Sequence, residues 1–317
     1  MPGNFRETIG ASIAEAMSQD NRIVLLGEGV ADAKGVFGTC LEARRRFPNR
    51  VIETPLSETM LTGACVGMAM EGLIPLYVHA RFDFTLFCFE HLINTAAKLA
   101  ALGRKCPIVF RVIVGRGWGQ GPTHSQSFHG MLAQVPGLDV FIPYSPSLYV
   151  QALAHALHSG RPTVIVESRR LYEQGLETWM WWETGCDIVL RPVGDGVLDA
   201  VEAQAQLMKL GLKANVEPLL QCNQLIGSMD STTPSVIIDM GHGGFGLMLG
   251  FGYERATVLC QRFEPTPMRS DLEATAYPTA ADIVGTALQL LGKQERSTEH
   301  RLFQNDGKPQ WLREEAF

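Results

Sequence analysis

Apolar residues are arranged in two different patterns along the first 175 positions. Short runs rich in valine, isoleucine and leucine predict buried strands at residues 23–26, 73–78, 108–114, 140–142 and 163–167. Between these runs, apolar positions spaced three and four residues apart predict helices at residues 5–18, 87–103 and 147–158. Because buried strands alternate with helices, we expect a doubly wound α/β domain with a parallel sheet.

The hydrophobic periodicity ends at residues 176–186, a segment without clear period that contains Trp179, Trp181 and Trp182. We expect a linker there. A second alternation follows, with strands expected at residues 188–190, 214–216 and 236–238 and helices at residues 197–210 and 280–291. We therefore expect a domain at residues 1–175 and a smaller α/β domain, with a mainly parallel sheet, at residues 187–293. The polar residues 294–317 are expected to form an irregular tail.

Composition and charge argue against several classes of protein. The chain has 317 residues and a formal net charge of -6, with acids and bases interspersed, so no patch for nucleic acid or anionic lipid is expected. The longest apolar stretch is interrupted by Glu71 and Pro75, which argues against a membrane span. The N-terminus lacks the pattern of a signal peptide, and the seven scattered cysteines suit a reducing compartment, so we expect a cytoplasmic protein.

A carboxylate stands where a predicted strand turns into a helix. The sequence Pro55-Leu56-Ser57-Glu58 follows the strand-like residues 50–53 and precedes a helix rich in small residues. Loops at strand ends point out of a parallel sheet, which would place Glu58 at a cleft. An acidic residue at a helix start can equally do no more than satisfy the helix dipole, and spacing alone leaves both interpretations open.

Further segments, taken in order, carry a resemblance. Gly27-Glu28, the Pro-Leu-Ser-Glu turn, the helix with Asn94-Thr95-Ala96-Ala97-Lys98 and the loop Thr123-His124-Ser125-Gln126 resemble the beta chains of the thiamine-dependent component of 2-oxo-acid dehydrogenase complexes. Past the linker, Gly243-Gly244-Phe245-Gly246 and the segment from Pro278 to Ile283 are similar to the C-terminal domain of the same chains. The resemblance covers about residues 4–292.

The resemblance implies a pyrimidine-binding site for thiamine diphosphate. Glu58 matches the carboxylate that shares a proton with the pyrimidine ring nitrogen, and Glu28 matches a cofactor-binding position. Phe82 and Phe84 match aromatic positions beside the pyrimidine, with Phe84 the expected stacking partner, although both could be core phenylalanines. His124 matches a histidine that reaches the substrate.

Two arginines depart from the family pattern. Arg81 stands beside the expected stacking pair, and Arg116 lies in the loop leading to His124. Both could be ordinary surface cations. If they face the cleft, they indicate a substrate with a carboxylate or phosphate beyond that of a short 2-oxo acid, because arginine binds such groups through two hydrogen bonds.

A possible magnesium motif lies in the second domain. Gly194-Asp195-Gly196, followed by Asn223, imitates the oxygen ligands that hold magnesium and diphosphate in thiamine enzymes. Too few residues follow it to build a complete diphosphate domain, so we interpret the motif as a coincidence and expect no metal ligand in this chain. Mg²⁺ and the diphosphate are then expected to be held by a partner.

These features together imply a beta-type subunit, active with an alpha-type chain in an α2β2 assembly. The expected reaction is decarboxylation of a 2-oxo acid, with transfer of the acyl unit to a lipoyl-bearing acyltransferase or another acceptor. A split transketolase-like enzyme that moves a two-carbon ketol unit between sugars is the alternative. A non-catalytic structural or regulatory subunit is a third possibility, which the retention of Glu58, Phe84 and His124 argues against.

Overall fold

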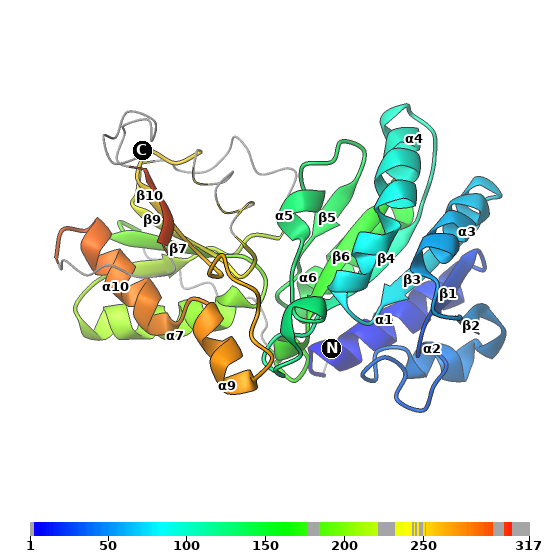
Figure 1. Cartoon of the computed structure of the whole chain (residues 1–317), viewed down its shortest axis with the longest axis horizontal. Coiled ribbons are helices and arrows are strands. Elements are labelled where there is room, and N and C mark those ends of the chain that lie inside the picture. Colours follow the sequence, from blue (N-terminus) through cyan, green and yellow to red (C-terminus); the bar gives the residue numbers. More distant parts are fainter. Residues whose placement is uncertain are drawn as a thin grey trace.

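The chain forms two α/β domains that lie side by side, the larger built from the N-terminal half (Figure 1). The structure, a computed structural model, describes residues 3–175, 184–220, 232–242, 244, 246, 250, 252–293 and 301–305. The linker predicted at residues 176–186 falls largely outside these ranges. None of the helices in the described ranges is both long enough and apolar enough to cross a bilayer.

The first domain contains a six-stranded sheet in which all neighbouring strands are parallel. The strand order is β2-β1-β3-β4-β6-β5. The bounds are β1 (Ile23–Gly27), β2 (Val51–Glu53), β3 (Ile74–His79), β4 (Val109–Val114), β5 (Asp139–Phe141) and β6 (Thr163–Ser168). The predicted doubly wound parallel sheet is confirmed.

Helices cover both faces of this sheet because successive strand residues point to opposite sides. Leu25 and Leu76 belong to the core cluster beneath α1 and α6, whereas Leu26 and Tyr77 belong to the cluster beneath α3. The bounds are α1 (Phe5–Gln19), α2 (Leu41–Arg46), α3 (Glu58–Met70), α4 (Lys98–Ala101), α5 (His129–Leu132) and α6 (Pro146–His158). The strands carry continuous apolar runs because both faces are buried.

One expected helix has three different pitches. The prediction for residues 87–103 was a single α-helix, but the chain forms a 3₁₀ helix, η2 (Phe82–Cys88), then a π-helix, η3 (Glu90–Ala97), and only then α4. The spacing of apolar residues could not reveal this, because Leu92, Ala96 and Ala97 are buried on the inner side whatever the local pitch. π-helical turns occur frequently at functional sites.

The second domain contains a five-stranded sheet of order β11-β10-β9-β7-β8, with β11 antiparallel and the remaining pairs parallel. The strands are β7 (Ile188–Pro192), β8 (Ala214–Val216), β9 (Ser235–Asp239), β10 (Ala256–Cys260) and β11 (Arg301–Asn305). The helices include α7 (Gly196–Lys209), α9 (Ser270–Glu273) and α10 (Ala280–Leu290). The mainly parallel sheet is confirmed.

Two strands of this sheet were not predicted. The expectation of an irregular tail over residues 294–317 was wrong at residues 301–305, which pair with β10 and close one edge of the sheet. The sequence of β11 is mostly polar, which is typical of an edge strand and resembles a loop in composition. The five-residue β10 is buried throughout, and its short apolar run between the charged Arg255 and Arg262 was a signal that the predictions left unused.

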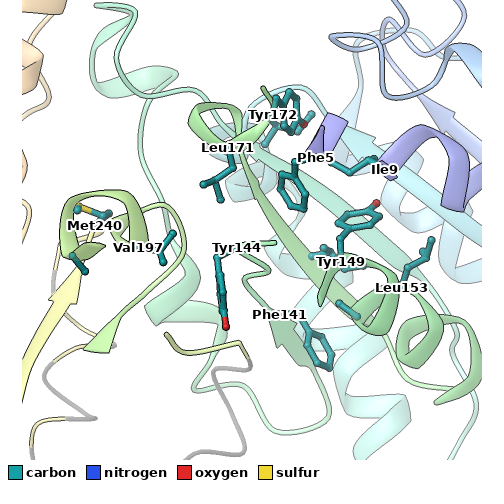
Figure 2. Packing of buried hydrophobic residues seen from close by; sticks show 14 of the residues in the cluster. Phe5, Ile9, Phe141, Tyr144, Tyr149, Leu153, Leu171, Tyr172, Val197 and Met240 are labelled. Atoms are coloured by element: carbon teal, nitrogen blue, oxygen red, sulfur yellow. The ribbon is translucent and has the colours of Figure 1, made fainter. Parts of the chain in front are cut away.

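Apolar packing continues from the first domain into the second. Figure 2 shows Tyr144 and Leu171 of the first domain facing Val197 and Met240 of the second, all within one cluster of buried residues. On the outer side of the same cluster, Phe5 packs edge-on against two tyrosines, Tyr149 and Tyr172, at ring-centroid distances of 5.9 and 6.3 Å.

An ion pair lies inside this core. Arg111 of β4 and Glu167 of β6 are both fully buried, with N···O distances of 2.6 and 2.9 Å, and the Tyr172 hydroxyl donates to the same carboxylate at 2.7 Å. Burial alone would lower the pKa of Arg111, but Glu167 outweighs it and raises the pKa well above its usual value. The guanidinium and the carboxylate therefore depend on each other for their hydrogen bonds inside the core.

We predict that Glu167→Gln lowers the free energy of unfolding by about 3–5 kcal/mol, because it leaves the Arg111 charge buried without a counter-charge. Urea denaturation measures the change. Glu173→Gln is the matched control: Glu173 forms an exposed pair with Arg6, so its loss should cost less than about 1 kcal/mol. Replacing both Arg111 and Glu167 with apolar residues should recover much of the loss, and equal costs for the two glutamines would contradict the prediction.

Candidate active site

A hollow opens at the carboxyl ends of β1, β2 and β3. It has a volume of about 250 Å³ and is open to solvent. The chain leaves β1 toward β2 on one side, whereas β3 lies on the other, so strand order reverses at the β1–β3 pair. Ligands of open α/β sheets bind at such reversals. The lining residues are Glu28, Thr54, Pro55, Leu56, Ser57, Glu58, Tyr77, Val78, His79, Ala80 and Phe84.

The backbones of β1 and β3 approach closely at the floor of the hollow. Gly27 has a φ of +151°, and a Cβ at this position would lie 2.6 Å from the Val78 carbonyl oxygen, so only glycine fits. Glu28 follows directly and is carried to the rim. Glu53, at the end of β2, fixes the same loop by accepting the Gly29 and Ala31 amides at 2.5 and 2.7 Å. Glu53 was not predicted as a site residue, although its place at a strand end was an available signal.

Two carboxylates face this hollow. Glu58 is the first residue of α3 and is half-buried, and Glu28, which also lines the hollow, is exposed. Within the described residues, neither carboxylate forms an ion pair or a side-chain hydrogen bond. The Thr54 hydroxyl, in the same lining, is buried and has no hydrogen-bond partner among the described residues. The hollow therefore offers three polar side chains that make no side-chain hydrogen bond or ion pair with the described parts of the chain.

A neutral histidine, His79, also lines the hollow. Burial lowers the pKa of His79 to about 3, so the imidazole is uncharged at physiological pH. Its Nδ1 lies 2.7 Å from the Thr85 hydroxyl, and its ring packs edge-on against Tyr77 at 4.4 Å. His79 was not predicted as a site residue, because its position at the end of an apolar strand resembles that of a core residue.

The two phenylalanines predicted beside the cofactor occupy different places. Phe84 lines the hollow, but Phe82 is fully buried in the core, edge-on to Phe128 at 5.8 Å. In an extended segment, residues two apart share a face, so both phenylalanines could lie beside one ligand. In the 3₁₀ helix observed, with three residues per turn, they point in different directions. The structure thus gives Phe82 a packing role and leaves Phe84 at the hollow.

His124 lies beside Phe84. Their rings meet edge to face with centroids 5.5 Å apart, and Nδ1 of His124 is 2.7 Å from the Thr123 hydroxyl. The histidine enters from the loop after β4, whereas Phe84 enters from η2. The structure therefore brings together Glu28, Glu58, Phe84 and His124, although 96 positions separate the first from the last in the sequence.

Arg81 points to the neighbouring loops. Its Nε and Nη2 donate to the Gln120 side-chain oxygen at 3.0 and 2.6 Å, and its guanidinium lies 5.2 Å from the Phe37 ring centroid. Arg169, which sequence analysis missed, lies 4.0 Å from the ring centroids of both Phe37 and Trp118. Burial lowers the pKa of Arg81, and Arg169 lowers it further. Among the described residues, neither arginine forms an ion pair with a carboxylate.

Arg116 instead serves the boundary between the domains. It is 5% exposed and binds Asp195 at 2.8 Å and Asp199 at 3.5 Å, and Arg170 binds the same two carboxylates. Both acids lie at the start of α7, where burial raises their pKa values, that of Asp199 to about 6. The tentative substrate role of Arg116 is not supported, because its charge is already neutralised from the second domain.

The same contacts bear on the magnesium motif. Asp195 faces two arginines, an arrangement opposite in charge to a cation site. Asn223, the other half of the motif, lies outside the described residues. Nowhere in the described ranges do three or more histidine, cysteine, aspartate or glutamate side chains cluster as a metal site would require.

Comparison with known proteins agrees with this geometry. The family described as "Transketolase, pyrimidine binding domain" matches residues 2–174. The pyruvate dehydrogenase E1 component subunit beta of Saccharomyces cerevisiae is 28% identical over 90% of this chain and 88% of its own length. The beta subunit of acetoin:2,6-dichlorophenolindophenol oxidoreductase from Cupriavidus necator is 28% identical over 90% of this chain and 96% of its own.

Among solved structures, a split-gene transketolase described as an inactive beta4 tetramer superposes with a TM-score of 0.71 over 93% of this chain and 100% of its own, at 18% identity. That likeness extends over both domains and concerns the fold. The chain therefore belongs to the transketolase pyrimidine-binding domain family, and its relatives include the beta subunits of pyruvate dehydrogenase E1.

Proposed function

We propose that this chain is the beta-type subunit of a thiamine-diphosphate-dependent enzyme that decarboxylates a 2-oxo acid and transfers the acyl unit. The observation that carries the proposal is the hollow at the β1–β3 reversal, with Glu28, Glu58 and Phe84 on its walls. A domain family named for pyrimidine binding, matched over residues 2–174, supports the same ligand.

The residues of the hollow fit an aminopyrimidine ring. The ring needs an aromatic or apolar face and polar partners in its own plane, and Phe84 and the unpartnered groups of Glu58 and Thr54 offer both. Glu58 would hold a proton against a ring nitrogen. When bound, thiamine diphosphate supplies the electron sink on which loss of carbon dioxide depends.

His124 would act on the substrate side. Its ring is fixed edge-on to Phe84, so a ring stacked on Phe84 would lie close to the imidazole. An imidazole can donate or accept a proton near neutral pH, which suits a group that handles the substrate or the acyl acceptor.

The proposal includes an alpha-type partner that supplies the Mg²⁺ and diphosphate ligands, in an α2β2 assembly. Exposed apolar side chains lie in the lining or within three positions of a lining residue in the sequence: Leu56 is 70% exposed, Met60 57% and Phe87 63%. A concentration of exposed apolar residues is typical of a protein interface. Both relatives are beta subunits, which supports a partner chain. A lipoyl-bearing acyltransferase is the proposed acceptor.

Arg81 and Arg169, which form no ion pair with a carboxylate in the part of the chain that the structure describes, extend the proposal to the substrate. Arg81 is 8% exposed and hydrogen-bonds only neutral acceptors among the described residues, and a buried cation costs free energy unless an anion meets it. We propose that a second carboxylate or a phosphate of the substrate binds near Arg81 and Arg169. This observation also favours the alternative of ketol transfer between phosphorylated sugars.

We predict that Glu58→Gln slows hydrogen–deuterium exchange at the thiazolium carbon by two or more orders of magnitude, because glutamine cannot hold the proton. The exchange is followed by NMR on the enzyme with its partner chain and cofactor. Glu71→Gln, an exposed substitution just past the far end of the same helix, is the control and should leave exchange unaltered. Unchanged exchange in the Glu58 variant would remove the residue from this role.

The coincidence interpretation of the magnesium motif yields a second prediction. Asp195→Ala should leave the affinity for thiamine diphosphate and Mg²⁺ unchanged, as measured by calorimetric titration of the assembled enzyme. The midpoint of urea unfolding should fall, because Arg116 and Arg170 lose a buried counter-charge. A magnesium-dependent loss of cofactor affinity would restore the motif as a metal site.

The substrate proposal predicts a selective effect. Arg81→Ala should raise KM for a phosphorylated or dicarboxylic substrate roughly tenfold or more, while pyruvate turnover changes little. Arg81→Lys should rescue poorly, because an ammonium lacks the planar pair of donors. The exposed Arg104→Ala is the control. Equal losses for every substrate, accompanied by weaker subunit association, would instead assign Arg81 to the interface.

A further inference from the structure

The loop that carries His124 is unusually rich in glycine. Glycine occupies every second position from Gly115 to Gly121, and three of these residues, Gly117, Gly119 and Gly121, have positive φ. Such a segment loses more conformational entropy on ordering than any other. Contacts from elsewhere in the molecule must therefore hold His124 in one position.

The second domain supplies those contacts through a buried carboxylate. Glu273, at the end of α9, is fully buried, and its Oε1 and Oε2 accept the backbone amides of Gly117 and Gly119 at 2.8 and 2.6 Å. Both side-chain oxygens are thus used to hold the main chain of the loop. The two amides together form one bidentate anchor.

The loop backbone also lies directly against the second domain. A Cβ on Gly119 would lie 2.6 Å from the Ser270 nitrogen, and one on Gly121 would lie 2.7 Å from Cγ of Met268. Further along, the Tyr277 hydroxyl donates to the Ser125 carbonyl oxygen at 3.4 Å. Residues 268–277 thus face the loop along most of its length.

We infer that Glu273 is a positioning residue: it holds the His124 loop from the second domain, although the hollow itself is built by the first. Glu273 bonds the main chain of the loop and has no contact with the hollow, so its effect passes through His124. The role of His124 in this inference rests on the proposed function, whereas the anchoring of the loop does not.

The direct test is amide hydrogen exchange, measured by mass spectrometry on the purified protein. Glu273→Gln retains the size of the side chain but presents one NH₂ group to a backbone N–H, so one anchor is lost. Exchange in peptides covering residues 115–126 should accelerate at least tenfold, while peptides of the β-strands stay unchanged. Glu264→Gln, an exposed substitution nine positions before Glu273, is the matched control. It should change exchange neither in the loop peptides nor in the strand peptides.

A second variant guards against a failure of Glu273→Gln to fold. Gly119→Ala leaves Glu273 intact but places a methyl group against Ser270, so it should free the same peptides. Unchanged exchange in the loop, or equal acceleration throughout the protein, would overturn the inference.

A second experiment measures activity on the assembled enzyme. Glu273→Gln should lower kcat with little change in the affinity for thiamine diphosphate, and it should add no further loss when combined with His124→Ala. Additive losses would show that Glu273 acts elsewhere and would overturn the inference. If thiamine-dependent activity is absent altogether, the proposed function fails, while the exchange experiment still decides whether the anchor exists.

Discussion

The parallel pairing of β1 with β3 is the constraint on which the site depends. The strands approach so closely at Gly27 and Val78 that no side chain fits between them, and the chain leaves β1 in the direction away from β3. The two loops at this reversal cannot fill the space above the strands, so a hollow remains. Glu28 is placed on its rim by the strand end, and Glu58 by the first turn of α3. The chemistry of the site thus follows from the order of the strands.

Periodicity along the sequence was sufficient for most of this architecture. Both parallel sheets and helices such as α1 and α6 were predicted because burial on both faces, or on one stripe, leaves a local record in the sequence. The pitch of a helix and the position of a strand at the edge of a sheet produce no such periodic pattern in the sequence. The 3₁₀ turn that separates Phe82 from Phe84 and the polar edge strand β11 are set by distant packing, and both were therefore missed.

The site shows the same division between local and distant information. Glu58 and His124 could be identified from motifs along the chain, and the structure brings both to the region of the hollow. The function of an arginine could not be identified in this way. Arg116 is neutralised by Asp195, which lies 79 positions away, whereas among the described residues Arg81 donates hydrogen bonds only to a glutamine and a backbone carbonyl. Sequence could not distinguish them, because the difference lies in the surroundings that the fold supplies.

The alternating glycines after β4 separate two tasks within one short loop. The main chain at Gly117 and Gly119 is used for attachment. The intervening side chains face three different partners: Arg116 binds Asp195, Trp118 stacks on Arg169 and Gln120 binds Arg81. Attachment through backbone amides does not depend on which side chains stand between them. Trp118 and Gln120 are therefore positions where replacement can redesign the surroundings of the two arginines without dismantling the loop, which makes this segment a natural starting point for altering specificity by engineering.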